Sequence, residues 1–202
     1  FVFCSFNNSY KITPAMFDVW MRVLRGAEGS VLWLLGSNAA VERNLRNEAR
    51  ARDVDPARLV FAPRLPYAEH LARYRAADLF LDTLPFNGGT TASDALWAGL
   101  PVLTCAGESF AARMAGSLLL AVGLPELVTH DLAAYETAAL RLASAADELA
   151  TVNSRLAQHR TTCPLFDTGR FRQHLEAAYV QMWQRQQRGE PPADFAVVPA
   201  AY

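Results

Sequence analysis

A glycine turn followed by two hydroxyl side chains is the part of the sequence that could bind an anion. The turn, Gly88-Gly89-Thr90-Thr91, lies between an apolar run at 78–81 and a helical pattern at 92–98. This order directs free backbone N–H groups and the positive end of a helix dipole at one place. Because the glycines admit a ligand and the threonines add donors, a phosphate or diphosphate fits there. A simple helix N-cap on a glycine turn explains these residues equally well.

Composition and charge limit the classes of protein to which the chain can belong. Its 202 residues are 51% hydrophobic and 19% charged, which is typical of a folded domain with a sizeable core. The formal net charge is −1, so we expect no general nucleic-acid surface and no polybasic membrane surface. No apolar segment is long enough to cross a bilayer and no signal peptide is visible, so we expect no membrane span.

The cysteines favour a reducing environment. Cys4, Cys105 and Cys163 are odd in number, far apart and without a C-x-x-C pair. A disulfide framework or a zinc site is therefore not expected, and buried thiols explain them better. We expect a cytoplasmic location. The chain also opens on an apolar strand pattern without an initiator methionine, so we expect it to be the downstream part of a longer polypeptide.

Strand and helix patterns alternate about five times along the chain. Apolar runs without a polar face lie at 1–6, 30–36, 58–61, 78–81 and 101–104. Helical patterns lie at 14–24, 39–52, 67–77, 92–98, 109–121, 132–144, 146–159 and 168–188. Such an alternation is typical of a parallel sheet that helices cover on both faces. The predicted fold class is therefore α/β, a Rossmann-like doubly wound parallel sheet.

Three polar stretches follow predicted strands and should meet at one edge of the sheet. They are 7–11 after the first strand, 63–70 after the third and 87–94 after the fourth. Ligands of doubly wound sheets bind at the carboxyl ends of the strands, so three stretches at that edge support a binding site better than one. No G-x-G-x-x-G follows the first strand, which argues against a dinucleotide oxidoreductase.

Several motifs are spread over nearly the whole chain: Phe6-Asn7-Asn8-Ser9-Tyr10-Lys11-Ile12, Val31-Leu32-Trp33-Leu34-Leu35, Asn87-Gly88-Gly89-Thr90-Thr91, Leu96-Trp97-Ala98-Gly99, Pro164-Leu165-Phe166-Asp167 and Tyr179-Val180-Gln181-Met182-Trp183. In type, order and spacing they resemble the O-linked N-acetylglucosamine transferases of glycosyltransferase family 41. The resemblance implies the C-terminal lobe of a GT-B enzyme, the lobe that holds the UDP of UDP-N-acetylglucosamine. The stretches rich in glycine and alanine suggest a bacterial relative.

The resemblance assigns roles around the diphosphate and the ribose. It gives Lys11 to the diphosphate as the catalytic cation, which suits a leaving group that gains charge. It gives Thr90 and Thr91 to the phosphate oxygens and Asp94 to the ribose hydroxyls. Less favoured alternatives are that Lys11 is a solvated turn lysine and that Asp94 is an acidic residue that favours the helix dipole.

The resemblance also assigns a nucleoside end. His70 and Arg73 lie three residues apart on one predicted helix and so share a face, and the family places this pair beside the nucleotide. The backbone near Leu65 would contact the uracil, and Tyr10 would pack against the sugar nucleotide. A lone histidine on a short helix is more often a surface or core residue, and a core position explains Tyr10 almost as well.

Three positions depart from the animal members of the family. Asn8 stands where these have glutamine, Tyr67 where they have lysine, and Gly89 where they have histidine. Asn8 and Gly89 belong to the implied UDP-sugar site, so the departures affect affinity and the choice of sugar more than UDP binding itself. The implied site is therefore Lys11 with Asn8, Tyr10, Leu65, His70, Arg73, Gly89, Thr90, Thr91 and Asp94, without a metal.

The function implied is an inverting, metal-independent transfer of N-acetylglucosamine from UDP to Ser or Thr hydroxyls of proteins. Residues 1–167 would form the UDP-sugar lobe, the helix 168–190 would pack on an N-terminal lobe that this chain lacks, and 191–202 would be a tail. Partners would be the UDP-sugar, a protein or peptide acceptor and that N-terminal lobe, which in this family can follow tetratricopeptide repeats. Alone, the chain should bind UDP weakly and catalyse nothing.

Three alternatives stay open at this point. Another GT-B enzyme with a small-molecule acceptor, or a nucleotide-sugar epimerase, would share the diphosphate site. A nucleotide-sugar sensor would bind the same ligand without turnover. A dinucleotide oxidoreductase is the least favoured, because the glycine fingerprint is missing.

Overall fold

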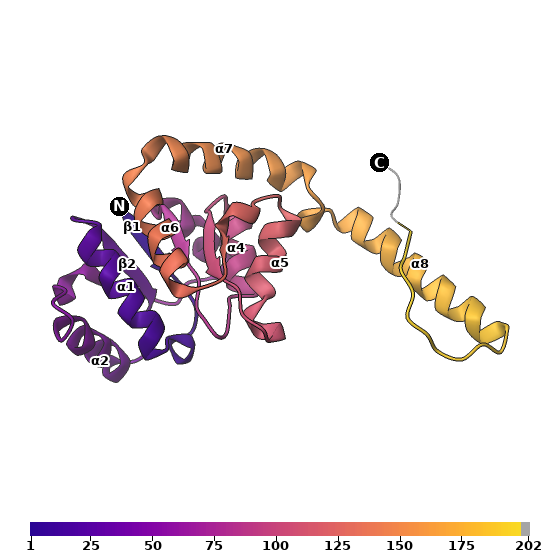
Figure 1. Ribbon diagram of the computed structural model, residues 1–202, viewed down its shortest axis with the longest axis horizontal. Coiled ribbons are helices and arrows are strands. Elements are labelled where there is room, and N and C mark those ends of the chain that lie inside the picture. Colours follow the sequence, from indigo (N-terminus) through magenta and orange to yellow (C-terminus); the bar gives the residue numbers. More distant parts are fainter. Residues whose placement is uncertain (199–202) are drawn as a thin grey trace.

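The computed structural model describes residues 1–198 and centres on a six-stranded parallel sheet (Figure 1). The strands are β1 (Val2–Ser5), β2 (Val31–Leu35), β3 (Leu59–Ala62), β4 (Leu79–Leu81), β5 (Val102–Cys105) and β6 (Val128–Thr129). Their order in the sheet is β3-β2-β1-β4-β5-β6. The chain therefore changes direction across the sheet between β1 and β4, and such a switch point is where doubly wound sheets bind ligands.

Helices cover both faces of the sheet. They are α1 (Pro14–Gly26), α2 (Ala39–Arg50), α3 (Tyr67–Arg73), α4 (Thr90–Ala98), α5 (Met114–Ala121), α6 (Leu132–Ser144), α7 (Ala146–Thr162) and α8 (Thr168–Gln187). The crossovers that lead from β1 toward β3 and those that lead from β4 toward β6 run in opposite directions across the sheet. Because such crossovers are right-handed, their helices lie on opposite faces. Accordingly α1 packs against α6, whereas α4 contacts α3, α5 and α7. The predicted α/β class is confirmed.

Local sequence signals explain where several helices begin and end. The Thr13 hydroxyl caps α1 by accepting from the Met16 N–H, and Pro14 occupies the first turn, as the sequence predicts. Asp131 caps α6 in the same way. Gly99 ends α4 with φ of +88°, a left-handed conformation that glycine adopts without strain.

One strand and two helix starts differ from those predicted from the sequence. β6 has only two residues and pairs with Thr104 and Cys105; so short a strand gives no periodic pattern, and its pairing depends on tertiary contacts. The helix expected at 109–121 is a 3-10 turn over Phe110–Ala112 followed by α5. The helix expected at 92 begins at Thr90, so the two threonines form its first turn.

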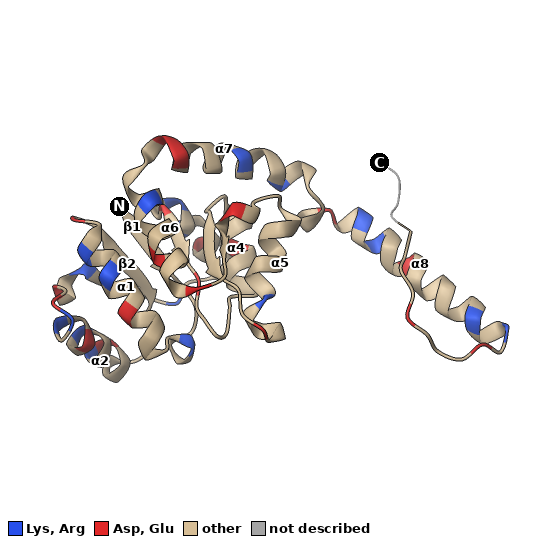
Figure 2. Ribbon diagram, viewed as in Figure 1, with Lys and Arg blue, Asp and Glu red and all other residues tan. Residues whose placement is uncertain are grey.

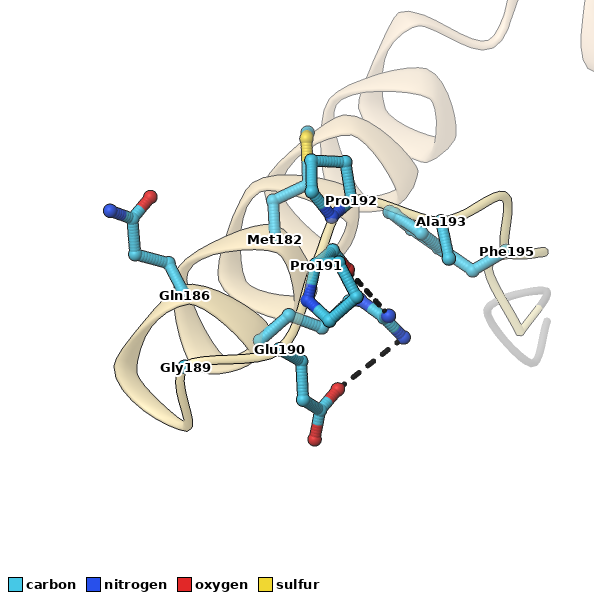
Figure 3. Close-up of a pocket in the computed structure, with 9 residues that line it drawn as sticks. Met182, Gln186, Gly189, Glu190, Pro191, Pro192, Ala193 and Phe195 are labelled. Carbon is cyan, nitrogen blue, oxygen red and sulfur yellow. Dashed lines mark hydrogen bonds and ion pairs between the residues drawn. The ribbon is translucent and has the colours of Figure 1, made fainter.

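The last helix projects from the rest of the structure (Figure 1). α8 contains no buried residue, and its exposed apolar side chains include Phe171, Tyr179 and Trp183. At its far end is a pocket of about 470 Å³, lined by Met182, Arg185, Gln186, residues 189–193 and Phe195 (Figure 3). Part of the expected tail, 199–202, lies outside the described residues.

Charged side chains of both signs are interspersed over the helices (Figure 2), in keeping with the net charge of −1. Across residues 1–198, none of the helices combines the length and the hydropathy that a membrane span requires.

Candidate functional site

The switch point gathers the residues that the sequence assigns to a diphosphate. The 3-10 helix η1 (Ser9–Lys11) follows β1, and the glycine turn follows β4. The Lys11 ammonium crosses from one to the other and donates to the carbonyl oxygen of Asn87 at 2.8 Å. It also lies 3.9 Å from the centre of the Phe86 ring. Burial lowers the pKa of Lys11, and the charge of Asp82 partly offsets this effect.

The first turn of α4 has no side-chain cap. Gly89 occupies the N-cap position and makes no side-chain hydrogen bond, and the helical bonding starts with Ser93 N–H donating to the Gly89 carbonyl. The preceding backbone N–H groups are the ones that a helix leaves for an external acceptor. Together with the Lys11 ammonium, they give a site that favours a phosphate group.

The two threonines of this turn face different surroundings. The Thr91 hydroxyl donates to Oδ1 of Asn7, so its one hydrogen is engaged within the protein. Thr90 is exposed and lines a larger cavity of about 790 Å³ with Ser93, Phe110 and Met114. Of the two hydroxyls, that of Thr90 is therefore the more accessible to a ligand.

A second pocket, of about 360 Å³, lies beside the turn. Its lining combines predicted site residues with others: Phe6, Asn8, Leu35, Arg64, Leu65, Tyr67, His70, Arg73 and Thr91. The structure thus brings together five predicted residues, from the segments that follow β1 and β3 and from α3 and α4. We call this cavity the nucleoside pocket. Tyr10 lies outside it and is 71% exposed, with its ring beside Phe86, so Tyr10 is not a core residue.

His70 and Arg73 contact each other directly. Arg73 Nε donates to Nδ1 of His70 at 3.0 Å, and Arg73 Nη1 donates to the Pro63 carbonyl at 2.9 Å. The Arg73 side chain is buried against the Phe6 ring, and its hydrogen bond orients the His70 ring. Burial, then the charge of Arg73, lowers the pKa of His70.

Asp94 is nearly buried, and Tyr67 donates its phenolic hydrogen to Oδ1 of Asp94 at 2.8 Å. The Tyr67 ring itself is exposed at the mouth of the nucleoside pocket. The tyrosine that replaces the lysine of animal enzymes therefore bonds the carboxylate assigned to the ribose. The ligand roles of all ten residues stay predictions.

Sequence reasoning did not assign a role to the buried network beneath the turn. Asp82 Oδ1 accepts from the Gly88 N–H at 2.6 Å and from Asn7 Nδ2 at 3.0 Å, and its Oδ2 accepts from the Thr104 hydroxyl at 2.6 Å. Burial raises the pKa of Asp82 to about 6. The sequence does contain a signal for this network, because Asn7 and Asp82 each directly follow a predicted buried strand.

Replacing Gly88 with alanine tests how tightly this network packs around the turn. A Cβ at this position would lie 2.6 Å from Thr91 Oγ1 and 3.0 Å from Asn7 Oδ1, so Gly88→Ala should lower the free energy of unfolding by about 2 kcal/mol. Gly116→Ala in α5 is the matched control, since its Cβ would lie at an ordinary 3.5 Å from Val128. This change should raise the free energy of unfolding by about 0.5–1 kcal/mol, because alanine favours a helix more than glycine does. Urea denaturation measures both, and equal effects would contradict the close packing at Gly88.

Comparisons with known proteins identify the family of the chain. The family described as "Glycosyl transferase family 41" matches residues 1–175. The chain is 40% identical over 199 residues to a probable UDP-N-acetylglucosamine–peptide N-acetylglucosaminyltransferase of Arabidopsis thaliana, covering 98% of this chain and 20% of that protein. It is also 40% identical over 190 residues to a UDP-N-acetylglucosamine–peptide N-acetylglucosaminyltransferase of Caenorhabditis elegans, covering 94% of this chain and 16% of that protein.

A solved structure shows the same fold. A lysine-to-methionine mutant of the Thermobaculum terrenum O-GlcNAc transferase superposes with a TM-score of 0.87 at 33% identity, covering 93% of this chain and 37% of that one. The chain thus spans about a fifth of the length of the two curated relatives. The predicted GT-B glycosyltransferase fold is confirmed, and the chain belongs to glycosyltransferase family 41.

Proposed function

We propose that this chain is the UDP-sugar-binding lobe of an inverting enzyme that transfers N-acetylglucosamine from UDP to Ser or Thr hydroxyls of proteins. The observation that carries the proposal is the Lys11 ammonium beside the uncapped first turn of α4, at the sheet's switch point. The activities for which the relatives from Arabidopsis thaliana and Caenorhabditis elegans are named support the donor and the peptide acceptor.

The geometry suggests how the lobe would serve this reaction. The nucleoside would occupy the pocket of His70, Leu65 and Asn8, and the diphosphate would lie between Lys11 and α4. Cleavage of the sugar–phosphate bond leaves additional negative charge on UDP, so groups that stabilise this charge accelerate the transfer. The attacking hydroxyl, and any group that takes its proton, would come from outside this chain.

We further propose that Lys11 and the helix N-terminus neutralise the leaving group without a metal ion. The full-length enzyme should then keep its turnover after treatment with EDTA, within about 2-fold. A loss that added Mg²⁺ or Mn²⁺ restores would contradict this proposal. The control is the same enzyme with the same protein acceptor, assayed without EDTA.

The apolar side of α8 supports the proposal that this helix packs on an N-terminal lobe of the same polypeptide, with or without preceding tetratricopeptide repeats. Tyr179 is 58% exposed and Trp183 is 64% exposed, one helical turn apart. Exposed aromatic side chains of this size are typical of interface anchors. We therefore propose that residues 168–190 belong to the contact between the lobes.

Replacing Tyr179 and Trp183 with alanine tests that contact. In the 202-residue chain the double variant should leave the free energy of unfolding unchanged within about 0.5 kcal/mol, because both side chains are exposed. In the full-length protein it should lower the stability by about 2–4 kcal/mol. Gln181→Ala and Gln184→Ala on the same helix are controls, and an unchanged full-length protein would contradict the docking of α8.

Calorimetric titration of the full-length protein with UDP, UDP-N-acetylglucosamine and NAD tests the function itself. We expect selective binding of the uridine ligands, and consumption of the UDP-sugar when a protein acceptor is present. Binding without turnover on any acceptor would indicate a sensor, and turnover only on small molecules would indicate another GT-B enzyme. Preference for NAD would mean that the glycine turn is only a helix cap.

We propose a bacterial, cytoplasmic setting for this enzyme. The free thiols of Cys4, Cys105 and Cys163 support a reducing compartment, and the solved relative from Thermobaculum terrenum supports a bacterial source.

A further inference from the structure

A buried tyrosine lies behind both halves of the candidate donor site. Tyr74 follows α3 directly, and only 1% of it is exposed. Its phenol oxygen is 3.3 Å from Nε2 of His70 and 3.3 Å from the carbonyl oxygen of Thr91. His70 and Thr91 both line the nucleoside pocket, and Thr91 also belongs to the first turn of α4. Tyr74 therefore bridges the nucleoside side and the diphosphate side.

The hydrogen bonds along this bridge have one direction. Arg73 has only donors, so the Nδ1 atom of His70 that it contacts carries no hydrogen. The hydrogen of the neutral imidazole is then on Nε2, which donates to the phenol of Tyr74. The phenol donates in turn to the Thr91 carbonyl. A lowered pKa of His70, caused first by burial, agrees with a neutral ring.

The Tyr74 ring has little freedom to leave this position. It packs against Phe6, with ring centres 5.2 Å apart, and against Phe80 at 6.3 Å. Both phenylalanines are buried: Phe6 directly follows β1, and Phe80 lies in β4, the two strands at the switch point. The sheet therefore fixes the ring, and the ring fixes the distance between His70 and the start of α4.

We propose that Tyr74 is a positioning residue that holds the first turn of α4 at a fixed position relative to the nucleoside pocket. This inference rests on the proposed function. The phenol touches neither the nucleoside nor the diphosphate, but it sets the relative position of the groups assigned to each. A nucleoside bound beside His70 then finds the N–H groups of α4 already placed for its diphosphate, which makes the binding of the two ends cooperative.

The test is the full-length protein and its Tyr74→Phe variant, titrated with uridine and with UDP. Removing the hydroxyl keeps the ring and cuts the bridge. The Kd for UDP should rise about 5- to 10-fold, the effect of one buried hydrogen bond. The Kd for uridine should change less than about 2-fold, because uridine uses one side of the site only.

Ser30→Ala is the matched control. It also removes a buried hydroxyl, which donates to the Ala27 carbonyl at the amino end of β2, away from the site. It should leave both affinities unchanged. UDP binding that Tyr74→Phe does not alter, or equal losses for uridine and UDP, would overturn the inference alone. A wild-type protein that binds no UDP would contradict the proposed function, and the inference with it.

A measurement on the wild type covers the case in which Tyr74→Phe does not fold. Saturating uridine, which has no phosphate, should slow hydrogen exchange of the amides at 92–93 by about 3-fold or more, because the bridge transmits its binding to α4. The amides at 115–118 in α5 are the internal reference. Unchanged exchange at 92–93 would overturn the inference.

Discussion

Replacing Lys11 with alanine in the full-length protein should lower kcat about 100- to 1,000-fold, the loss typical when one charge-stabilising donor is removed from an active site. The ammonium is held by the Asn87 carbonyl at 2.8 Å, beside the start of α4, where the proposed leaving group gains charge. Affinity for UDP should fall by about 10-fold or less, because part of this charge develops only in the transition state. Steady-state kinetics and calorimetry measure the two effects separately.

The control for this variant is Arg22→Ala. It removes a partly exposed cation that pairs with Glu136 on α6 and lines neither the nucleoside pocket nor the cavity beside Thr90, so it should leave kcat unchanged. If Lys11→Ala weakens UDP binding and leaves kcat intact, Lys11 binds the donor without stabilising the leaving group, and the catalytic assignment is wrong.

The second large effect is expected at Asp82. Asp82→Ala should lower the free energy of unfolding of the 202-residue chain by about 3 kcal/mol, because it leaves buried donors without their acceptor. The Gly88 N–H, Asn7 Nδ2 and the Thr104 hydroxyl all donate to this carboxylate. The turn that precedes α4 should lose its shape with them. Urea denaturation at pH 7 measures the loss.

Asp82→Asn is the matched control, and it separates charge from shape. The asparagine oxygen can still accept from Gly88 and Asn7, while its amide can donate to the Thr104 hydroxyl. The variant should therefore be at least as stable as the wild type at pH 7. A loss as large as that of Asp82→Ala would show that the negative charge, rather than the acceptor geometry, holds the turn.

The wild type and Asp82→Asn should also differ in how the free energy of unfolding depends on pH. Burial raises the pKa of Asp82 to about 6 in the folded chain, against about 4 in an unfolded one. The folded state therefore binds this proton more tightly, and the resulting stabilisation is complete below pH 4 and lost as the pH rises to 6. Relative to Asp82→Asn, the wild type should lose about 2–3 kcal/mol across that window. A constant difference between the two would contradict the raised pKa.

Much of the fold followed from local patterns. The apolar runs predicted five strands and their parallel arrangement, because strands buried on both faces leave no polar positions. The caps at Thr13 and Gly99 predicted helix ends, since cap preferences depend on a few neighbouring residues. β6 could not be predicted, because a two-residue strand depends on its partner, β5, and not on its own sequence.

The site was predictable in its parts but not in its internal contacts. The glycine turn, Lys11 and the pair His70 and Arg73 all lie at the expected edge of the sheet. That Thr91 bonds Asn7, and that Tyr67 bonds Asp94, could not be predicted, because these partners are far apart in the sequence. Only the folded chain shows that two predicted ligands already have partners within the protein.

Lys11 also has a consequence for chemical labelling. It is the only lysine in the sequence, so an amine-reactive reagent has a single side chain to modify in this chain. Its lowered pKa increases the share of unprotonated, nucleophilic amine at a given pH. A bound diphosphate would cover that amine, so the rate of modification at Lys11, followed in a peptide digest to separate it from the α-amino group, would report directly on occupancy of the site.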